Sequence, residues 1–130
     1  MRSPSLVTIG SEVTATAALT VVPFADVKRA TVEITSAGTF LNRSGVLTAA
    51  VSMDGTNYTT FNMLIPNVAN SNAEQLTRVA ATTAISTTGK SAIYTIDELT
   101  PFKDIKFTLT VTDGGTPTGN FTVKVYKQYA

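Results

Sequence analysis

The chain contains no cysteine, histidine or tryptophan. Without cysteine, no disulfide, thiolate metal site or cysteine nucleophile can form. Without histidine, the commonest general base and metal ligand is missing, and Ser-His-Asp and Cys-His hydrolysis are excluded. Without tryptophan, an aromatic platform for a sugar ring would have to come from the four tyrosines and six phenylalanines. We therefore expect no enzyme, no cofactor and no bound metal ion.

Charge is also sparse. Charged residues make up 15% of the chain, below the usual roughly 25%, and the net charge is only +1. Such a balance gives no electrostatic footprint for nucleic acid or an anionic membrane. No apolar run approaches the ~20 residues that span a bilayer, and polar residues such as Glu12 interrupt the N-terminal stretch that would have to serve as a signal peptide. We expect neither nucleic acid nor membrane as a partner.

The residues that are abundant favour β-structure. Threonine is the commonest residue and hydrophobic residues reach 43%, too many for a disordered chain. β-Branched side chains such as threonine and valine suit a pleated, half-buried surface. A length of 130 residues suits a single domain with one core.

Two stretches alternate apolar and polar residues most clearly, Val46–Tyr58 and Asp104–Asp113. Alternation gives a strand one apolar face, because successive side chains point to opposite sides of the sheet. The residues predicted to face the core are Leu47, Ala49, Val51 and Met53 in the first stretch and Ile105, Phe107, Leu109 and Val111 in the second. We predict that these two stretches are the central strands of an antiparallel sandwich.

Shorter strands are predicted on both sides of this pair. They are Leu6–Ile9, Val13–Phe24, Val27–Thr35, Tyr58–Ile65, Ala92–Leu99 and Phe121–Tyr126. Ser36–Gly45 and Asp113–Gly119 are predicted loops, with Phe40 and Leu41 folded onto the core. The long connection Asn67–Lys90 is irregular, with a possible short helix over Ala73–Ala81.

These elements predict an all-β fold, an antiparallel, jelly-roll-like β-sandwich of about eight strands with one long irregular connection. Residues 1–12 are predicted as an N-terminal arm and residues 13–130 as the single domain.

The Asp54–Asn57 segment, DGTN, begins like a calcium-binding loop. Such a loop needs a glutamate at its twelfth position, and that position holds Ile65. We interpret the segment as a hairpin turn in which Asp54 and Asn57 cap backbone groups.

Candidate interface residues lie in the predicted N-terminal arm and in the irregular connections. Arginine is favoured at protein interfaces because its planar fork makes paired hydrogen bonds to carboxylates. The candidates are Arg2, Leu6 and Ile9 in the arm, Arg43 in a loop, and Leu76 and Arg78 in the long connection.

The run Val51–Phe61, VSMDGTNYTTF, resembles a pattern found in small bacteriophage structural proteins. In that pattern an aromatic strand, a Phe-led strand, a Gly-rich hairpin and a last Val/Lys strand follow. The corresponding parts here are Ala92–Leu99, Pro101–Phe102 with Ile105–Val111, Asp113–Gly119 and Phe121–Lys127. The resemblance covers roughly residues 27–127. This chain departs from many relatives in having Tyr58 in place of a tryptophan and Lys106 in place of an arginine.

The resemblance implies a virion structural protein, made in the host cytoplasm, of the capsid decoration or cement type. Its implied partners are the major capsid protein and copies of itself, as a homodimer or homotrimer. No functional residue is carried over, because these relatives have no catalytic motif. Two alternatives stay open: a tail or head-fibre component, and a carbohydrate-binding module for host adsorption that would use Tyr58, Phe61 and Tyr94.

Overall fold

The computed structural model describes residues 3–66, 76–82, 84–88, 91–96 and 102–129. Within these residues every regular element is a β-strand, and the all-β antiparallel prediction is confirmed. The same residues contain no helix that could cross a membrane. The strands are β1 (Ser5–Val13), β2 (Ala17–Ala18), β3 (Val22–Pro23), β4 (Val27–Ser52), β5 (Thr59–Phe61), β6 (Met63–Pro66), β7 (Leu76–Val79), β8 (Ser91–Ile96) and β9 (Asp104–Tyr129).

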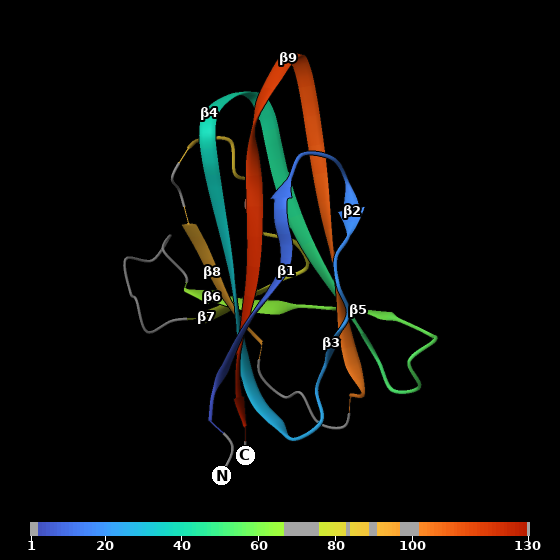
Figure 1. Ribbon diagram of the computed structural model, residues 1–130. Coiled ribbons are helices and arrows are strands. Elements are labelled where there is room, and N and C mark those ends of the chain that lie inside the picture. The colour runs from blue at the N-terminus through green and yellow to red at the C-terminus, as the bar shows by residue number, and fades with distance from the viewer. Residues whose placement is uncertain (1–2, 67–75, 83, 89–90, 97–101, 130) are drawn as a thin grey trace.

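The fold is built on a ribbon of two long strands, β4 and β9, of 26 residues each. They pair antiparallel from Val27 opposite Tyr129 to Ser52 opposite Asp104, with register shifts after Val27 and around the residues between Ala37 and Arg43. Both strands rise, bend at the top and return, so the ribbon folds back on itself (Figure 1). The bend falls where the register shifts, between Ala37 and Arg43. One continuous hydrogen-bonded sheet thereby supplies two packed layers.

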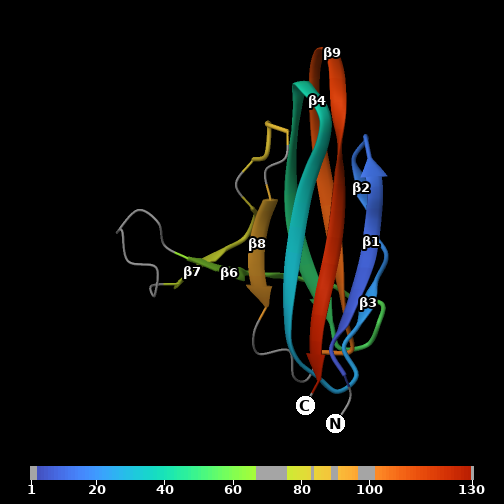
Figure 2. The ribbon, with the colours of Figure 1, turned by 60° about the vertical axis from the view of Figure 1, so that its left-hand side comes forward.

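The first layer contains residues 27–37 of β4 and 120–129 of β9, with β1 added beside β9 and β8 beside β4. The second layer contains residues 43–52 of β4 and 104–113 of β9, with β2 and β3 beside β9 and β5 beside β4. β1, β2 and β3 lie at one margin, and β6, β7 and β8 at the other (Figure 2).

The core lies between the two layers. The first layer contributes Val32, Ile34, Phe121, Val123 and Val125, and the second contributes Leu47, Ile105, Phe107 and Leu109, all at most 1% exposed. Each such side chain stabilises the fold by about 1.5–3 kcal/mol through burial. The predicted core face of the central strands is confirmed except at Met53. That side chain is 70% exposed, because β4 ends at Ser52 and Met53 opens the following turn.

The predicted loop Ser36–Gly45 is wrong, because β4 runs through it while paired with β9. Asp113–Gly119, also predicted as a loop, belongs to β9. Left-handed backbone at Gly38, Asn42, Gly115 and Gly119 turns both strands together. Of the two residues predicted to fold onto the core here, Phe40 packs against it, whereas Leu41 is 54% exposed.

The predicted N-terminal arm, residues 1–12, needs correction from Ser5 onward. β1 pairs with β9 from Ser5 opposite Lys127 to Val13 opposite Phe121. Ile9 is only 4% exposed, so this segment belongs to the core-forming part of the domain. The edge strand predicted over Leu6–Ile9 is confirmed, since β1 stands at the end of the strand order.

The predicted helix over Ala73–Ala81 is also wrong where it can be compared. β7 is a strand paired with β6, with Met63 opposite Val79, and Ala81 bridges Thr48. Residues 73–75 lie outside the described residues. The single strand predicted over Tyr58–Ile65 is divided in two, because β5 pairs with β4 in the second layer whereas β6 pairs with β7 and β8.

Candidate interaction surface

The predicted interface residues do not form one site. Leu6 and Ile9 lie in β1, Leu76 and Arg78 lie in β7, and these two strands stand at opposite ends of the strand order. Arg43 lies in the bend of the ribbon. Arg2 is outside the described residues.

Arg43 connects the two strands of the ribbon at their bend. Its Nε donates to Asp113 Oδ1 at 2.8 Å, its Nη2 to Asp113 Oδ2 at 3.1 Å and its Nη1 to the carbonyl of Gly119. The hydrogen bonds from Arg43 hold the pKa of Asp113 below its usual value, and the pKa of Arg43 is raised in return. The arginine side chain is 9% exposed. Its fork is thus engaged within the chain, which indicates a structural role.

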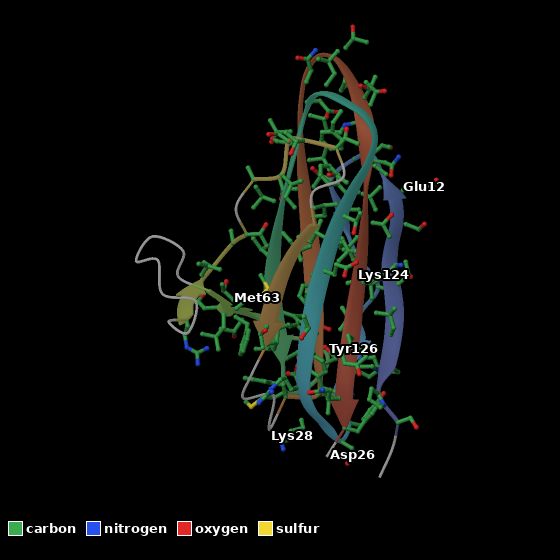
Figure 3. All side chains as sticks on the ribbon, turned by 90° about the vertical axis from the view of Figure 1, so that its left-hand side faces the viewer. Glu12, Asp26, Lys28, Met63, Lys124 and Tyr126 are labelled. Carbon is green, nitrogen blue, oxygen red and sulfur yellow. The ribbon has the colours of Figure 1, made fainter. Side chains whose placement is uncertain are left out.

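The two candidates in β1 point in opposite directions. Ile9 is buried, whereas Leu6 is 61% exposed. Leu6 lies directly opposite Tyr126 of β9, which is 39% exposed, so the two side chains share the outer face of the first layer. Figure 3 shows Tyr126 and Lys124 on this face, with β1 along its right-hand margin. Tyr126 was not among the predicted candidates.

We call residues Ser5–Thr8, together with Tyr126, the β1 margin. Its strand is the last in the sheet order of the described residues, and Ser5–Thr8 keeps a regular register with β9. Edge strands are normally protected by charge, proline, bulges or covering segments. Beyond Thr8 there are two irregularities in register, and the Ile9 carbonyl accepts a hydrogen bond from Thr20 N. Ser5–Thr8 has no charge, no proline and no bulge.

Two of the three aromatic residues proposed for sugar binding, Tyr58 and Phe61, are engaged in contacts with neighbours. The Tyr58 hydroxyl donates to Asp104 Oδ1 at 2.7 Å, a bond that raises the pKa of Tyr58, and Lys106 Nζ lies 4.3 Å from the ring centroid. Phe61 packs edge-on against Phe102 with centroids 5.7 Å apart. The side chain of Tyr94 lies outside the described part of the structure.

A pocket of about 410 Å³ lies beside Phe61. Its size is within the range of small-molecule sites. The lining residues are Val51, Met53, Asp54, Asn57, Thr59, Thr60, Phe61 and Phe102. A second hollow of about 510 Å³ lies at the bend of the ribbon, around Arg43 and Asp113.

The Asp54–Asn57 segment is the capped turn that the sequence predicted. Asp54 Oδ1 accepts hydrogen bonds from the backbone N–H groups of Asn57 and Thr56 and from Ser52 Oγ, at 2.8 to 2.9 Å. Its Oδ2 accepts from Asn57 Nδ2 at 2.7 Å. These bonds, led by that from Asn57 N–H, hold the pKa of Asp54 well below its usual value.

We expect Asp54→Asn to lower the melting temperature at pH 7 and to lower it by less at pH 2. A carboxylate whose folded pKa is depressed contributes stability above its unfolded pKa of about 3.9 and loses it as the pH falls. Thermal melts across this range measure the effect, with Asp26→Asn, an exposed aspartate in another turn, as the control. A difference from the wild type that stays constant with pH would contradict the role of the Asp54 charge.

Comparisons with known proteins bear on the fold. No family model matches the sequence, and no curated protein matches it significantly. The structure is similar to the crystal structure of the SPBc2 prophage-derived protein YomS, with a TM-score of 0.63 and 13% sequence identity. The match covers 96% of this chain and 92% of that one. A neighbour of prophage origin is consistent with the resemblance to small phage proteins, and the fold of this chain is one that a prophage-derived protein also adopts.

Proposed function

We propose that the protein is a structural component of a phage particle, a decoration protein that stabilises the head by bridging capsid subunits. The observation that carries the proposal is the likeness to a prophage-derived protein over nearly the whole of both chains. The phage-like pattern around Val51–Phe61 supports it independently. The partner is the major capsid protein, and the location is the virion.

The architecture suits a mechanical role. The β4–β9 ribbon gives both layers the same two strands, so the layers are joined covalently and through one core. Arg43 adds an ion pair across the bend. Within each layer, a force along the ribbon is therefore borne by a regular ladder of backbone hydrogen bonds between β4 and β9. Modest contacts repeated over a lattice then sum to a high avidity.

Bridging requires contact surfaces that are far apart on the assembled protein. Arg78 is exposed at the β7 end of the strand order, where its Nη1 also lies 3.5 Å from the Asn62 carbonyl. We propose this end as the surface that contacts the capsid. Arginine is enriched among interface residues whose truncation costs the most affinity.

The test is to add the purified protein to phage heads that lack it. We expect saturable binding and a higher temperature of head disruption. Arg78→Ala should weaken binding about tenfold or more, the effect of losing one strong interface residue. Lys28→Ala, another exposed cation remote from β7, is the matched control. Binding to tails but not to heads would replace the decoration role with a tail role, and glycan binding without particle binding would favour the carbohydrate-binding alternative.

A further inference from the structure

We propose that two copies of the chain pair through their β1 margins, antiparallel about a twofold axis, to form one sheet that continues through both molecules. The pairing itself is independent of the proposed function. Its use in bridging the capsid rests on the proposed function. A dimer would carry two β7 ends, one in each copy, and each could contact a capsid subunit. The class of partner is therefore a second copy of this chain.

The chemistry of the margin favours pairing with itself. Ser5–Thr8, SLVT, has no charge, so antiparallel pairing of two copies sets no like charges opposite each other. The nearest charge on the outer face, Lys124, lies opposite Glu33 in the neighbouring strand of the same copy. A foreign strand would gain the same backbone hydrogen bonds, but nothing on this neutral margin would select it by charge.

The bulge limits the possible register. The regular stretch ends at Thr8, and Ile9 is the extra residue where the register passes from Thr8 to Gly10. A twofold axis at Leu6 pairs Ser5–Val7 of the two copies and leaves the bulge outside. Thr8 then lies opposite Pro4 of the second copy, which has no N–H to donate, so the paired stretch ends there. An axis at Val7 would bring Ile9 into the pairing.

The axis at Leu6 also covers the most exposed apolar side chain of the margin. Leu6 then lies opposite Leu6 of the second copy, and Tyr126 flanks the pair on each side. The result is a row of four apolar side chains on the outer face. Val7, which is 38% exposed, gains cover opposite Ser5 of the second copy. A single contact between two copies would therefore cover both exposed apolar side chains of β1, Leu6 and Val7.

The register can be tested by crosslinking, because the chain has no cysteine. A residue on a twofold axis meets itself, so Leu6→Cys should form a disulfide-linked dimer under mild oxidation. Val21→Cys, at a position 41% exposed and outside β1, is the control and should remain largely uncrosslinked. Equal crosslinking of the two variants would overturn the proposed register.

The interface itself is tested by light scattering after size-exclusion chromatography over a concentration series. The wild type should be a dimer, and Leu6→Lys should raise the dissociation constant at least tenfold by setting two ammonium groups opposite each other. Leu41→Lys, at a position of similar exposure in the bend, should remain a dimer. Thermal melts would show that both variants fold. A wild-type monomer at every concentration, or an unaffected Leu6→Lys dimer, would overturn the pairing.

The two proposals fail separately. A monomer that binds phage heads would overturn the β1 pairing and leave the decoration role in place. A dimer that binds neither heads nor other phage parts would overturn the decoration role and leave the β1 pairing in place.

Discussion

Replacing Gly45 with valine is expected to cost about 3 kcal/mol of stability or more, the upper part of the range for overpacking a core. A Cβ atom at Gly45 would lie 2.6 Å from Phe121 Cζ and within 3.0 Å of two other ring atoms. Phe121 is fully buried and packs edge-on against Phe40 at 5.1 Å, so its ring has little room to move. Since native domains are stable by about 5–15 kcal/mol, this one change would remove a large part of the total.

Urea unfolding measures this loss. Gly114→Ala is the control, because Gly114 lies in the adjoining bend of the ribbon and its added Cβ would have no neighbour within 4 Å. We expect that control to stay within about 0.5 kcal/mol of the wild type. Coincident unfolding midpoints for Gly45→Val and the wild type would mean that the Phe121 ring does not lie against Gly45.

The central pairing of the fold could be predicted from sequence because its signal is local and repeated. Alternation placed Leu47 and Ala49 on one apolar face and Phe107 and Leu109 on another, and the structure pairs Leu47 with Leu109 and Ala49 with Phe107. A shift of one residue would have sent every one of these side chains to solvent. The burial pattern therefore determines the register.

The bend could not be predicted, because glycine is compatible both with a loop and with a sharp bend inside a pair of strands. Gly38 in one strand and Gly115 and Gly119 in the other are typical of loops. Here they let two paired strands turn together, which is a property of the pair and not of either segment alone. In β1, the bulge after Thr8 interrupts the alternation that would have marked Ser5–Val13 as one strand.

The candidate surface was predictable only in part. Arg43 looked like an interface arginine because its partner, Asp113, is 70 residues away in sequence. Tyr126 was missed as an interface candidate, although Phe121, Val123 and Val125 recur at every second position on the core face and so place Tyr126 on the outer face. Its position opposite Leu6 depends on the β1 register, and the bulge conceals that register.

Deleting residues 1–9 is expected to destabilise the whole domain, in contrast to the loss of a free arm. The deletion removes Ile9 from the core and takes away the partner of β9 over Lys124–Lys127. It also removes the carbonyl that accepts a hydrogen bond from Thr20 N. Truncating a buried isoleucine to alanine alone costs about 2–5 kcal/mol, and the lost strand pairing adds to that. We expect a melting temperature far below that of the wild type, or no cooperative melt.

Deleting residues 1–4 is the control for this prediction, because these residues precede β1 and their loss should leave the melt unchanged. Two substitutions within β1 separate its effect on stability from its effect on assembly. Leu6 is exposed and Ile9 is buried, so Leu6→Lys should weaken pairing between copies while the melt of each copy persists, and Ile9→Ala should lower the melting temperature. A wild-type melt in the chain lacking residues 1–9 would show that β1 adds nothing to the core, and the margin at which two copies are proposed to meet would then have no rigid support.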